Sequence, residues 1–316
     1  MQGAVGLKRG FIIGALAAAI FGALLAATPQ QAHAITPIPG RIFALTDDNG
    51  VQGDLFRTRT NTIWKRLTTG LSFPDGLSAA PNGTFAAICA TRSLGGTYRI
   101  FRVSANGGPL KNLIGNRQGC GPAVSPDGRQ VAYIQNLPTG GRLLRVVSAK
   151  GGEPRTIRRF PASYPVYALA WGGKRIFFNQ YYDVFSVSAR TGKDLKMHTD
   201  DRGAARDFQL ADVSADGKRL LIVVDESLEI VPNVFLRVYK PGGALVRTVD
   251  SSGSANNPFS MARFGPSGPN GVVGFLDTIT PPSMIYLIQP GAVWSAGFAG
   301  PSVSTAGPTS FDWVKR

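Results

Sequence analysis

A repeat of about 45 residues restricts what this chain can form more than any other feature of its sequence. Successive copies are marked by the turn glycines Gly83, Gly128, Gly173 and Gly217, which are 45, 45 and 44 residues apart. A degenerate fifth copy ends at Gly268, 51 residues further on. A regular period of this length predicts a series of similar supersecondary units that pack against one another.

Each copy is predicted to contain four antiparallel strands. Asn-Gly and Asp-Gly steps accept the positive φ angles of a two-residue type I′ turn, and apolar β-branched and aromatic residues flank them. A second turn follows about 19 to 25 residues later, after a strand of alternating pattern. The second turns are Asn106-Gly107-Gly108, Lys150-Gly151-Gly152, Thr191-Gly192, Pro241-Gly242-Gly243 and Pro290-Gly291. Four-stranded units at this period indicate the blades of a β-propeller.

The two ends of the chain are predicted to share one blade. Arg41–Leu45 resembles a second strand with no first strand before it, and Thr309–Trp313 resembles a first strand with nothing after it. Their pairing would remove both free sheet edges and close the ring. We therefore expect an all-β, six-bladed propeller of four-stranded antiparallel blades. The expected blades are 40–70 with 309–316, 75–116, 118–160, 164–200, 207–252 and 258–300.

The first 34 residues have the pattern of an export signal. Lys8 and Arg9 precede an apolar run, 11–27, and Ala32-His33-Ala34 is a small-x-small cleavage site. The alternative is a retained membrane anchor, for which the run is about long enough. We expect cleavage, which leaves a single propeller domain, 35–316, in the periplasm or outside the cell.

The segment Ser125–Tyr133, with the sequence SPDGRQVAY, resembles the repeat of TolB-type propellers. The segment Asp47–Phe56 is similar to the loop between the second and third strands in that family. The resemblance covers 40–316 and implies the propeller fold. It does not imply a Tol–Pal role, because too few residues precede Arg41 for TolB's N-terminal domain. Such blades serve as binding platforms and as enzymes, so the fold leaves the function open.

The inner strands supply the candidate site. Alignment on the turn glycine places one row of residues five positions before it: Ser78, Ala123, Ala168, Asp212 and Arg263, with Ser310 in the closing strand. Strand alternation directs this row, and the row two residues later that includes Asp312, toward the central channel. The charges Asp212, Arg263 and Asp312 are therefore the candidate binding residues. They form either a structural ion-pair cluster or the anchor of a ligand.

Catalysis has little support in the sequence. After signal cleavage the only histidine is His198, which we expect to be a solvated residue on an outer strand, and no Gly-x-Ser-x-Gly elbow occurs. The enzyme alternative is a metal-dependent hydrolase or lactonase that holds a cation at the channel mouth with oxygen ligands. Its candidate ligands are Asp75, Asp212, Asp312, Asn179 and Asp277. We expect a non-catalytic binding scaffold without a cofactor, and leave metal binding in the channel open.

The net charge of +15, from 34 Lys and Arg against 19 Asp and Glu, bears on partners. The basic residues form no nucleic-acid motif, so they provide either a solvated exterior or attraction to an acidic protein or cell-envelope polymer. We expect a monomer that contacts membrane only through an uncleaved signal.

Cys89 and Cys120 are the only cysteines. Both stand at strand ends on the side of the ring opposite the Asp-Gly turns, and export would place them in an oxidising compartment. The glycines beside Cys120 allow the bend that a bond between neighbouring blades requires. Two buried thiols are the alternative to a disulfide.

Overall fold

A computed structural model describes residues 40–46, 52–58, 63–93, 95–199, 206–226, 234–253, 261–266, 268, 270–277, 284–288, 298–299 and 308–315. These residues lie within the compact unit Pro37–Arg316. Their regular secondary structure is entirely β, and none of them belongs to a helix long and apolar enough to span a membrane. The predicted signal, residues 1–34, and the loop Asp47–Gly50 lie outside the described residues.

The strands form antiparallel sheets, which are numbered here in chain order. Sheet 1 contains β25 (Pro308–Val314), β1 (Arg41–Thr46), β3 (Leu55–Thr58) and β4 (Trp64–Arg66). Sheet 2 contains β2 (Gln52–Gly53), β5 (Leu71–Ala79), β6 (Phe85–Thr91), β7 (Arg99–Ser104) and β8 (Lys111–Asn112). Sheet 3 contains β9 (Cys120–Val124), β10 (Gln130–Asn136), β11 (Arg142–Ser148) and β12 (Arg155–Phe160).

The remaining strands form three sheets of the same kind. Sheet 4 contains β13 (Val166–Gly172), β14 (Arg175–Gln180), β15 (Asp183–Ser188) and β16 (Lys196–Met197). Sheet 5 contains β17 (Asp207–Val213), β18 (Leu220–Asp225), β19 (Val234–Tyr239) and β20 (Leu245–Gly253). Sheet 6 contains β21 (Arg263–Phe264), β22 (Val273–Asp277), β23 (Met284–Ile288) and β24 (Phe298–Ala299).

The sheets are the four-stranded antiparallel blades of a β-propeller, with one exception. Among the described residues, five sheets have four strands and sheet 2 has five. The fifth strand, β2, comes from the preceding connection and pairs with Leu71 and Ser72 at the start of β5. The prediction of four strands in every blade is therefore wrong for sheet 2.

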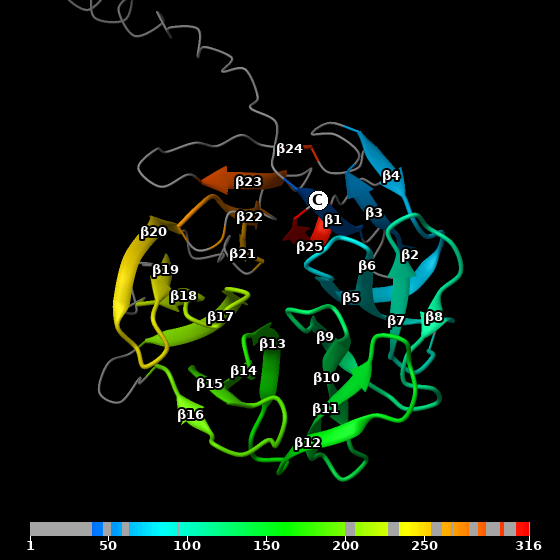
Figure 1. Cartoon of the computed structure of the whole chain (residues 1–316), viewed down its shortest axis with the longest axis horizontal. Coiled ribbons are helices and arrows are strands. Elements are labelled where there is room, and N and C mark those ends of the chain that lie inside the picture. Colours follow the sequence, from blue (N-terminus) through cyan, green and yellow to red (C-terminus); the bar gives the residue numbers. More distant parts are fainter. Residues whose placement is uncertain are drawn as a thin grey trace, which may run out of the picture. The chain divides into compact units, whose positions relative to one another are not determined.

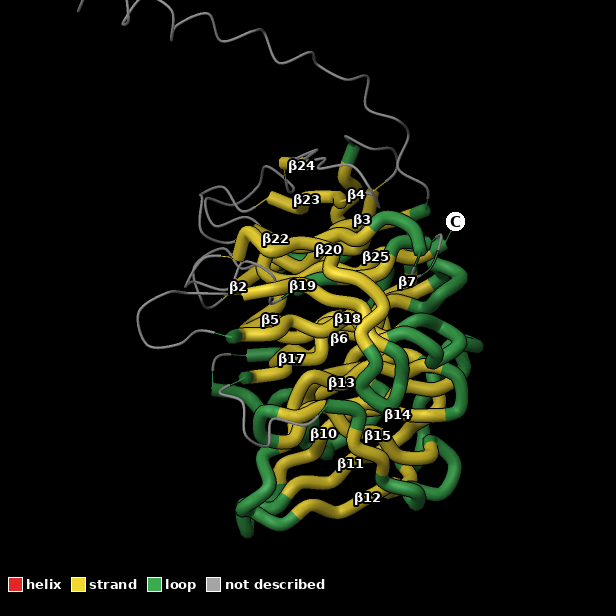
Figure 2. The backbone as a smooth tube through the Cα atoms, turned by 90° about the vertical axis from the view of Figure 1, so that its left-hand side faces the viewer, coloured by secondary structure: helices red, strands yellow, loops and turns green. Residues whose placement is uncertain are grey.

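The two terminal strands of the described chain lie side by side. β1 pairs antiparallel with β25, with Arg41 opposite Val314 and Leu45 opposite Ser310, which is the pairing predicted for Arg41–Leu45 and Thr309–Trp313. The first strands of successive sheets also contact one another, from β25 to β5, β9, β13, β17 and β21, and β21 contacts β25 again. Figure 1 shows these strands around a common centre, and Figure 2 shows them between two loop-bearing faces.

The turns at the repeat motif are longer than predicted. The N–H of Gly128 donates to Ser125 O at 2.8 Å, and the N–H of Ser125 donates to Gln130 O at 2.9 Å. Only the glycine of the Asp-Gly pair has a positive φ, +70°, whereas a type I′ turn needs two such residues. Four residues, 126–129, therefore connect Ser125 to Gln130, and Pro126 and Asp127 lie at the centre of the turn. The type I′ assignment is wrong here.

Apolar side chains fill the space between neighbouring sheets. Phe43 of sheet 1 and Phe101 of sheet 2 belong to one buried cluster, and Phe177 of sheet 4 packs with Leu220 of sheet 5 in another. Both faces of the inner strands are covered, so all seven residues of β6 are buried. Burial of both faces explains why these strands are continuously apolar rather than alternating.

His198 is buried rather than solvated, which corrects the prediction for this residue. Its side chain, 4% exposed, lies between sheets 4 and 5. Nδ1 accepts a hydrogen bond from the N–H of Gly242 at 3.1 Å, and Nε2 lies 2.7 Å from the Ser186 hydroxyl oxygen. The sequence suggested an outer strand, but it could not show that the next sheet's outer turn covers this strand.

Candidate functional site

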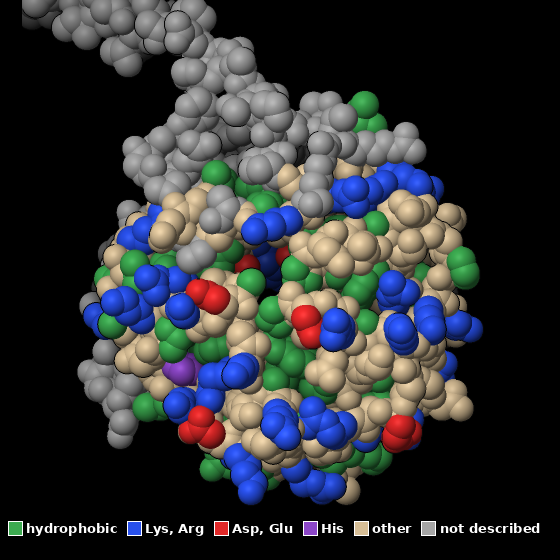
Figure 3. All heavy atoms as spheres, viewed as in Figure 1, with side chains coloured by type: hydrophobic (Ala, Val, Ile, Leu, Met, Phe, Trp, Pro, Cys, Tyr) green, Lys and Arg blue, Asp and Glu red, His purple; other side chains and the backbone are tan. Residues whose placement is uncertain are grey.

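A cavity of about 980 Å³ occupies the centre of the propeller. Its wall comes from the first strands of all the sheets, β5, β9, β13, β17, β21 and β25, and from the turns that follow them. Figure 3 shows its opening as a hollow in the face that carries these turns, with basic and acidic side chains inside it. Such concave sites at the centre of a fold are where ligands usually bind.

The structure brings the three predicted site residues together in this cavity. Asp212 is on β17, Arg263 on β21 and Asp312 on β25, and all three line the wall. The Arg263 charge acts on both carboxyl groups and favours their ionised forms. Its Nη1 also donates to Ala211 O at 2.6 Å and Ala262 O at 2.8 Å, which holds the guanidinium against the strands.

Each carboxylate also joins two sheets. Asp212 Oδ2 accepts from the N–H of Phe264 in sheet 6 at 2.8 Å, and Oδ1 accepts from the N–H of Val213 at 2.7 Å. Asp312 repeats this arrangement with the N–H of Ala79 in sheet 2, at 2.6 Å, and with the N–H of Trp313, at 2.8 Å. These bonds connect the first strands of adjacent sheets at the cavity wall.

The repeated contact corrects the predicted alignment of the last strand. Ser78 Oγ accepts from the N–H of Val124 in the next sheet at 3.0 Å, as Asp212 and Asp312 do. Asp312, not Ser310, therefore occupies the position of Ser78 and Asp212. The alignment was two residues off because the closing strand has no turn glycine from which to count.

Burial shifts the protonation of both carboxyl groups. It raises the pKa of Asp212 to about 6, although the Arg263 charge opposes the rise and the Asp312 charge adds to it. Burial likewise raises the pKa of Asp312 above its usual range, and Arg263 again opposes. A like-charged neighbour in a poorly solvated site makes ionisation of the second carboxyl costly.

Of the other proposed metal ligands, only the side chain of Asn179 is described, and it does not join this group. Asn179 is fully buried: its amide donates to Phe208 O at 2.5 Å, and its carbonyl accepts from the N–H of Leu210 at 2.7 Å, which joins sheets 4 and 5. The side chains of Asp75 and Asp277 lie outside the described set. Within the described residues, no three His, Cys, Asp or Glu side chains are placed to hold one metal ion.

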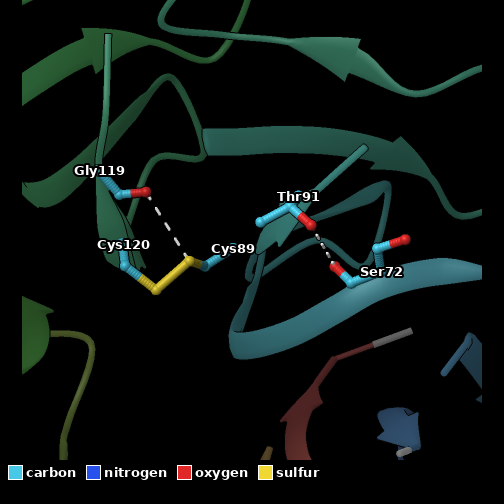
Figure 4. Close-up of a disulfide and its surroundings, with 5 residues drawn as sticks. All are labelled: Ser72, Cys89, Thr91, Gly119 and Cys120. Carbon is cyan, nitrogen blue, oxygen red and sulfur yellow. Dashed lines mark hydrogen bonds between the residues drawn. A yellow bond between two sulfur atoms is a disulfide. The ribbon is translucent and has the colours of Figure 1, made fainter. Parts of the chain in front are cut away.

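Cys89 and Cys120 form a disulfide between sheets 2 and 3, with Cα atoms 5.1 Å apart (Figure 4). Cys120 lines the cavity, and Cys89 Sγ is 3.7 Å from Gly119 O. A Cβ on Gly119 would lie 2.4 Å from the Tyr133 ring, so glycine is needed for this close approach.

Four tyrosines that the sequence pattern did not single out lie at the ends of the strands opposite the turns. Tyr164, Tyr167, Tyr181 and Tyr182 are 41–54% exposed, and they are the exposed aromatic residues of the described chain. The rings of Tyr164 and Tyr181 meet edge to face with centroids 5.9 Å apart, and Tyr167 lines the cavity. The sequence does contain a signal for this group, because four of the chain's 8 tyrosines are concentrated within 164–182.

No family model and no curated protein matches the chain. Among solved structures, TolB from Acinetobacter baumannii superposes with a TM-score of 0.62 at 13% identity, over 79% of this chain and 61% of that one. A chain of a nidogen/laminin complex gives a TM-score of 0.60 at 12% identity, over 87% and 97%. An oligogalacturonate lyase in complex with manganese gives 0.52 at 12% identity, over 79% and 82%.

These likenesses establish a fold. The chain is a β-propeller, and it has the TolB-type propeller fold that its Ser125–Tyr133 motif resembles. It spans 61% of the length of the TolB chain that it matches. The neighbours include both a protein complex and an enzyme, so the fold is compatible with either kind of function.

Proposed function

We propose that this protein is an exported, monomeric, six-bladed propeller, closed by the pairing of β1 with β25, that acts as a non-catalytic binding scaffold. A partner protein or cell-envelope polymer is its ligand. The contacts of first strands from β25 through β21 and back to β25 support the closed ring. The signal pattern in residues 1–34 supports export to the periplasm or the exterior.

The hydrogen bonding of the cavity carboxylates carries the scaffold proposal. Both oxygens of Asp212 and both of Asp312 accept backbone N–H groups, two of which belong to neighbouring sheets. Carboxylates held in this way stabilise the wall of a preformed site. These bonds give both carboxylates a structural role, because they join the first strands of neighbouring sheets at the cavity wall. A fixed, preformed wall is what a binding scaffold requires, so this role supports the scaffold proposal.

The alternative is a metal-dependent hydrolase or lactonase with its site at the channel mouth. The similarity to the fold of a lyase in complex with manganese favours this second candidate. A metal enzyme needs oxygen ligands that converge on the cation. Asp212 and Asp312 are the described carboxylates closest to meeting that need.

Two measurements separate these functions, one on the mature protein and one in the producing cells. The first is isothermal titration calorimetry with Mn²⁺ and Ca²⁺, together with lactone hydrolysis. We expect no saturable metal binding that depends on Asp212 or Asp312. Metal-stimulated hydrolysis that Asp212→Asn abolishes would establish the enzyme instead.

The second measurement is site-specific photocrosslinking in the producing cells. A photoreactive amino acid at Ser78 or Tyr167, at the cavity wall, should give a discrete adduct. The same amino acid at Thr156, exposed on an outer strand, serves as the matched control. Equal adducts from both positions, or none from the wall, would contradict binding at the channel.

N-terminal sequencing of the exported protein tests the predicted signal. The sequence should start at Ile35; a start at Met1 would contradict cleavage.

A further inference from the structure

The face that carries the turns is strongly basic. In sheets 3 and 4 the inner and outer turns lie at the same end, since the N–H of Ala149 donates to Arg129 O and that of Ala189 to Lys174 O, at 2.8 and 2.9 Å. In sheet 5 both turns flank the paired residues Leu220 and Tyr239. The exposed cations at or beside these turns are Arg129, Lys150, Lys174, Arg190, Lys193, Lys218, Lys240 and Lys315. Figure 3 shows this face, with Lys and Arg side chains spread around the central hollow.

The acidic residues of the same face are engaged locally. Asp127 Oδ1 accepts from the Ser125 hydroxyl at 2.6 Å and the N–H of Arg129 at 3.0 Å, and these hydrogen bonds lower the pKa of this carboxyl. Asp216 makes the same two contacts in its own turn, and Asp194 pairs with Arg175 at 2.6 Å. Among the described residues, none of the exposed cations named above is in an ion pair.

The positions of the cations indicate a long ligand. Lys150 is on sheet 3, Lys174 on sheet 4 and Lys218 on sheet 5, each on its own turn. A small anion could neutralise few of them, whereas a polymer with repeated charges can contact many and gain from counterion release. The inner turns of sheets 4 and 5 are in contact, since the N–H of Gly173 donates to Ala215 O at 2.8 Å. Lys174 and Lys218, which belong to these two turns, are therefore on neighbouring turns.

The composition of this face distinguishes between kinds of polyanion. Lysine predominates, and lysine is depleted in protein–protein interfaces. The exposed aromatic residues of the described chain, Tyr164, Tyr167, Tyr181 and Tyr182, belong to the opposite ends of the strands. The described part of the turn face therefore lacks the stacking side chains that single-stranded nucleic acid uses and the aromatic anchors typical of membrane surfaces.

We propose that the turn face binds a linear acidic polysaccharide, whose carboxylates repeat along the chain and pair with the turn lysines. The inference rests on the proposed scaffold function and names the class of its ligand. Binding is electrostatic and spread over several blades, so affinity falls steeply with salt concentration. Asp212, Asp312 and Arg263 take no part in it.

The test measures binding of alginate, a carboxylated polysaccharide, to the mature protein by calorimetry at NaCl concentrations from about 50 to about 300 mM. Over this range, added salt increasingly screens the interactions between surface charges. The test variant Lys174→Glu/Lys218→Glu reverses two charges of the turn face. The matched control Arg92→Glu/Arg159→Glu makes the same change in net charge at the opposite ends of the strands. We expect about tenfold weaker binding and a shallower salt dependence for the test variant, and at most about a twofold change for the control.

Several outcomes would overturn the proposal. They are no alginate binding by the wild type, equal losses in both variants, or equal binding of neutral dextran. Binding to vesicles with an anionic lipid such as phosphatidylglycerol, or to single-stranded DNA, but not to alginate would identify another class of ligand. Melting curves identify a folding defect, in which case Lys150→Glu/Lys240→Glu replaces the test variant. The channel crosslinks do not depend on these lysines, so failure here and failure of the scaffold function are distinguishable.

Discussion

At the scale of single residues, one position of the first strand links neighbouring sheets. Ser78, Asp212 and Asp312 each accept a backbone N–H from the next sheet. Ala123 and Ala168 stand at the corresponding positions of sheets 3 and 4 and have no side-chain acceptor. This hydrogen bond between sheets is thus a repeated structural contact. It forms part of a charged cluster only in the sheets where aspartate occupies the position.

Asp212 predicts a pH dependence of stability. Its folded pKa of about 6 is above the ordinary value of 3.8, so the folded protein holds the proton more tightly than the unfolded chain. The resulting stabilisation is complete below about pH 4 and is lost as pH rises through 6, a change on the order of 2–3 kcal/mol. Urea denaturation at pH 4, 5, 6 and 7 should show that Asp212→Asn lacks this loss. Identical slopes for the variant and the wild type would contradict the raised pKa.

His198 predicts the opposite trend over nearly the same range. Burial, with the charges of Arg175 and Lys196, lowers the pKa of His198 from 6.5 to about 4, so the unfolded chain binds the proton more tightly. This contribution is present above pH 6.5 and is lost as pH falls toward 4, a change on the order of 3 kcal/mol.

The variant His198→Gln should therefore be less stable than the wild type at pH 7, because the hydrogen bond from Gly242 is impaired. Its deficit should shrink as the pH is lowered to 4. Arg159→Gln, an exposed change on sheet 3, is the control and should leave the pH profile unaltered. A deficit that is constant with pH would show that His198 is not buried in its neutral form.

At the scale of elements, sheets 2 and 3 are connected covalently as well as by packing. The chain bends at Gly121, with φ of +64°, and Gly119 allows contact with the Tyr133 ring. These two glycines bring Cys120 to Cys89 at the cavity wall. The glycines on either side of Cys120, which the sequence indicated as the place where the chain could bend, are the residues at which it bends.

The disulfide predicts a specific loss of stability. Cys89→Ser/Cys120→Ser should lower the free energy of unfolding by about 3 kcal/mol, because the bond closes a loop of 31 residues in the unfolded chain. Denaturant titration without reductant measures the loss, and wild type under reducing conditions should match the variant. Titration of the unfolded, unreduced protein should find no free thiol; two thiols per chain would show that the bond is absent.

At the scale of the whole molecule, the proposed ring depends on the last strand. β25 pairs with β1 and also supplies Phe311 and Trp313 to the cluster beside sheet 6. Deletion of 309–316 should remove this cluster and expose the edge of β1, so the protein should aggregate or lose its cooperative thermal transition. Deletion of 315–316 alone is the control and should melt like the wild type. A cooperative, unchanged melt for the longer deletion would refute closure by β25.

The sequence by itself determined the type of unit and where each unit lies. Turn glycines at a constant period and apolar strands specify hairpins through local backbone preferences, which act without the rest of the chain. The same local information located Asp212, Arg263 and Asp312 on first strands. It misjudged the turn type because Asp127 has a negative φ, a detail set by the hydrogen bonds of Ser125 and Asp127.

Only the tertiary structure decided how these residues interact. Whether His198 is solvated depends on Gly242, 44 residues away in another sheet, and the partner of Asp312 is the N–H of Ala79, 233 residues away. The fifth strand of sheet 2 likewise depends on where the preceding connection passes β5. Hydrogen bonds and burial between sheets arise from packing in three dimensions, and a pattern of local preferences carries no record of them.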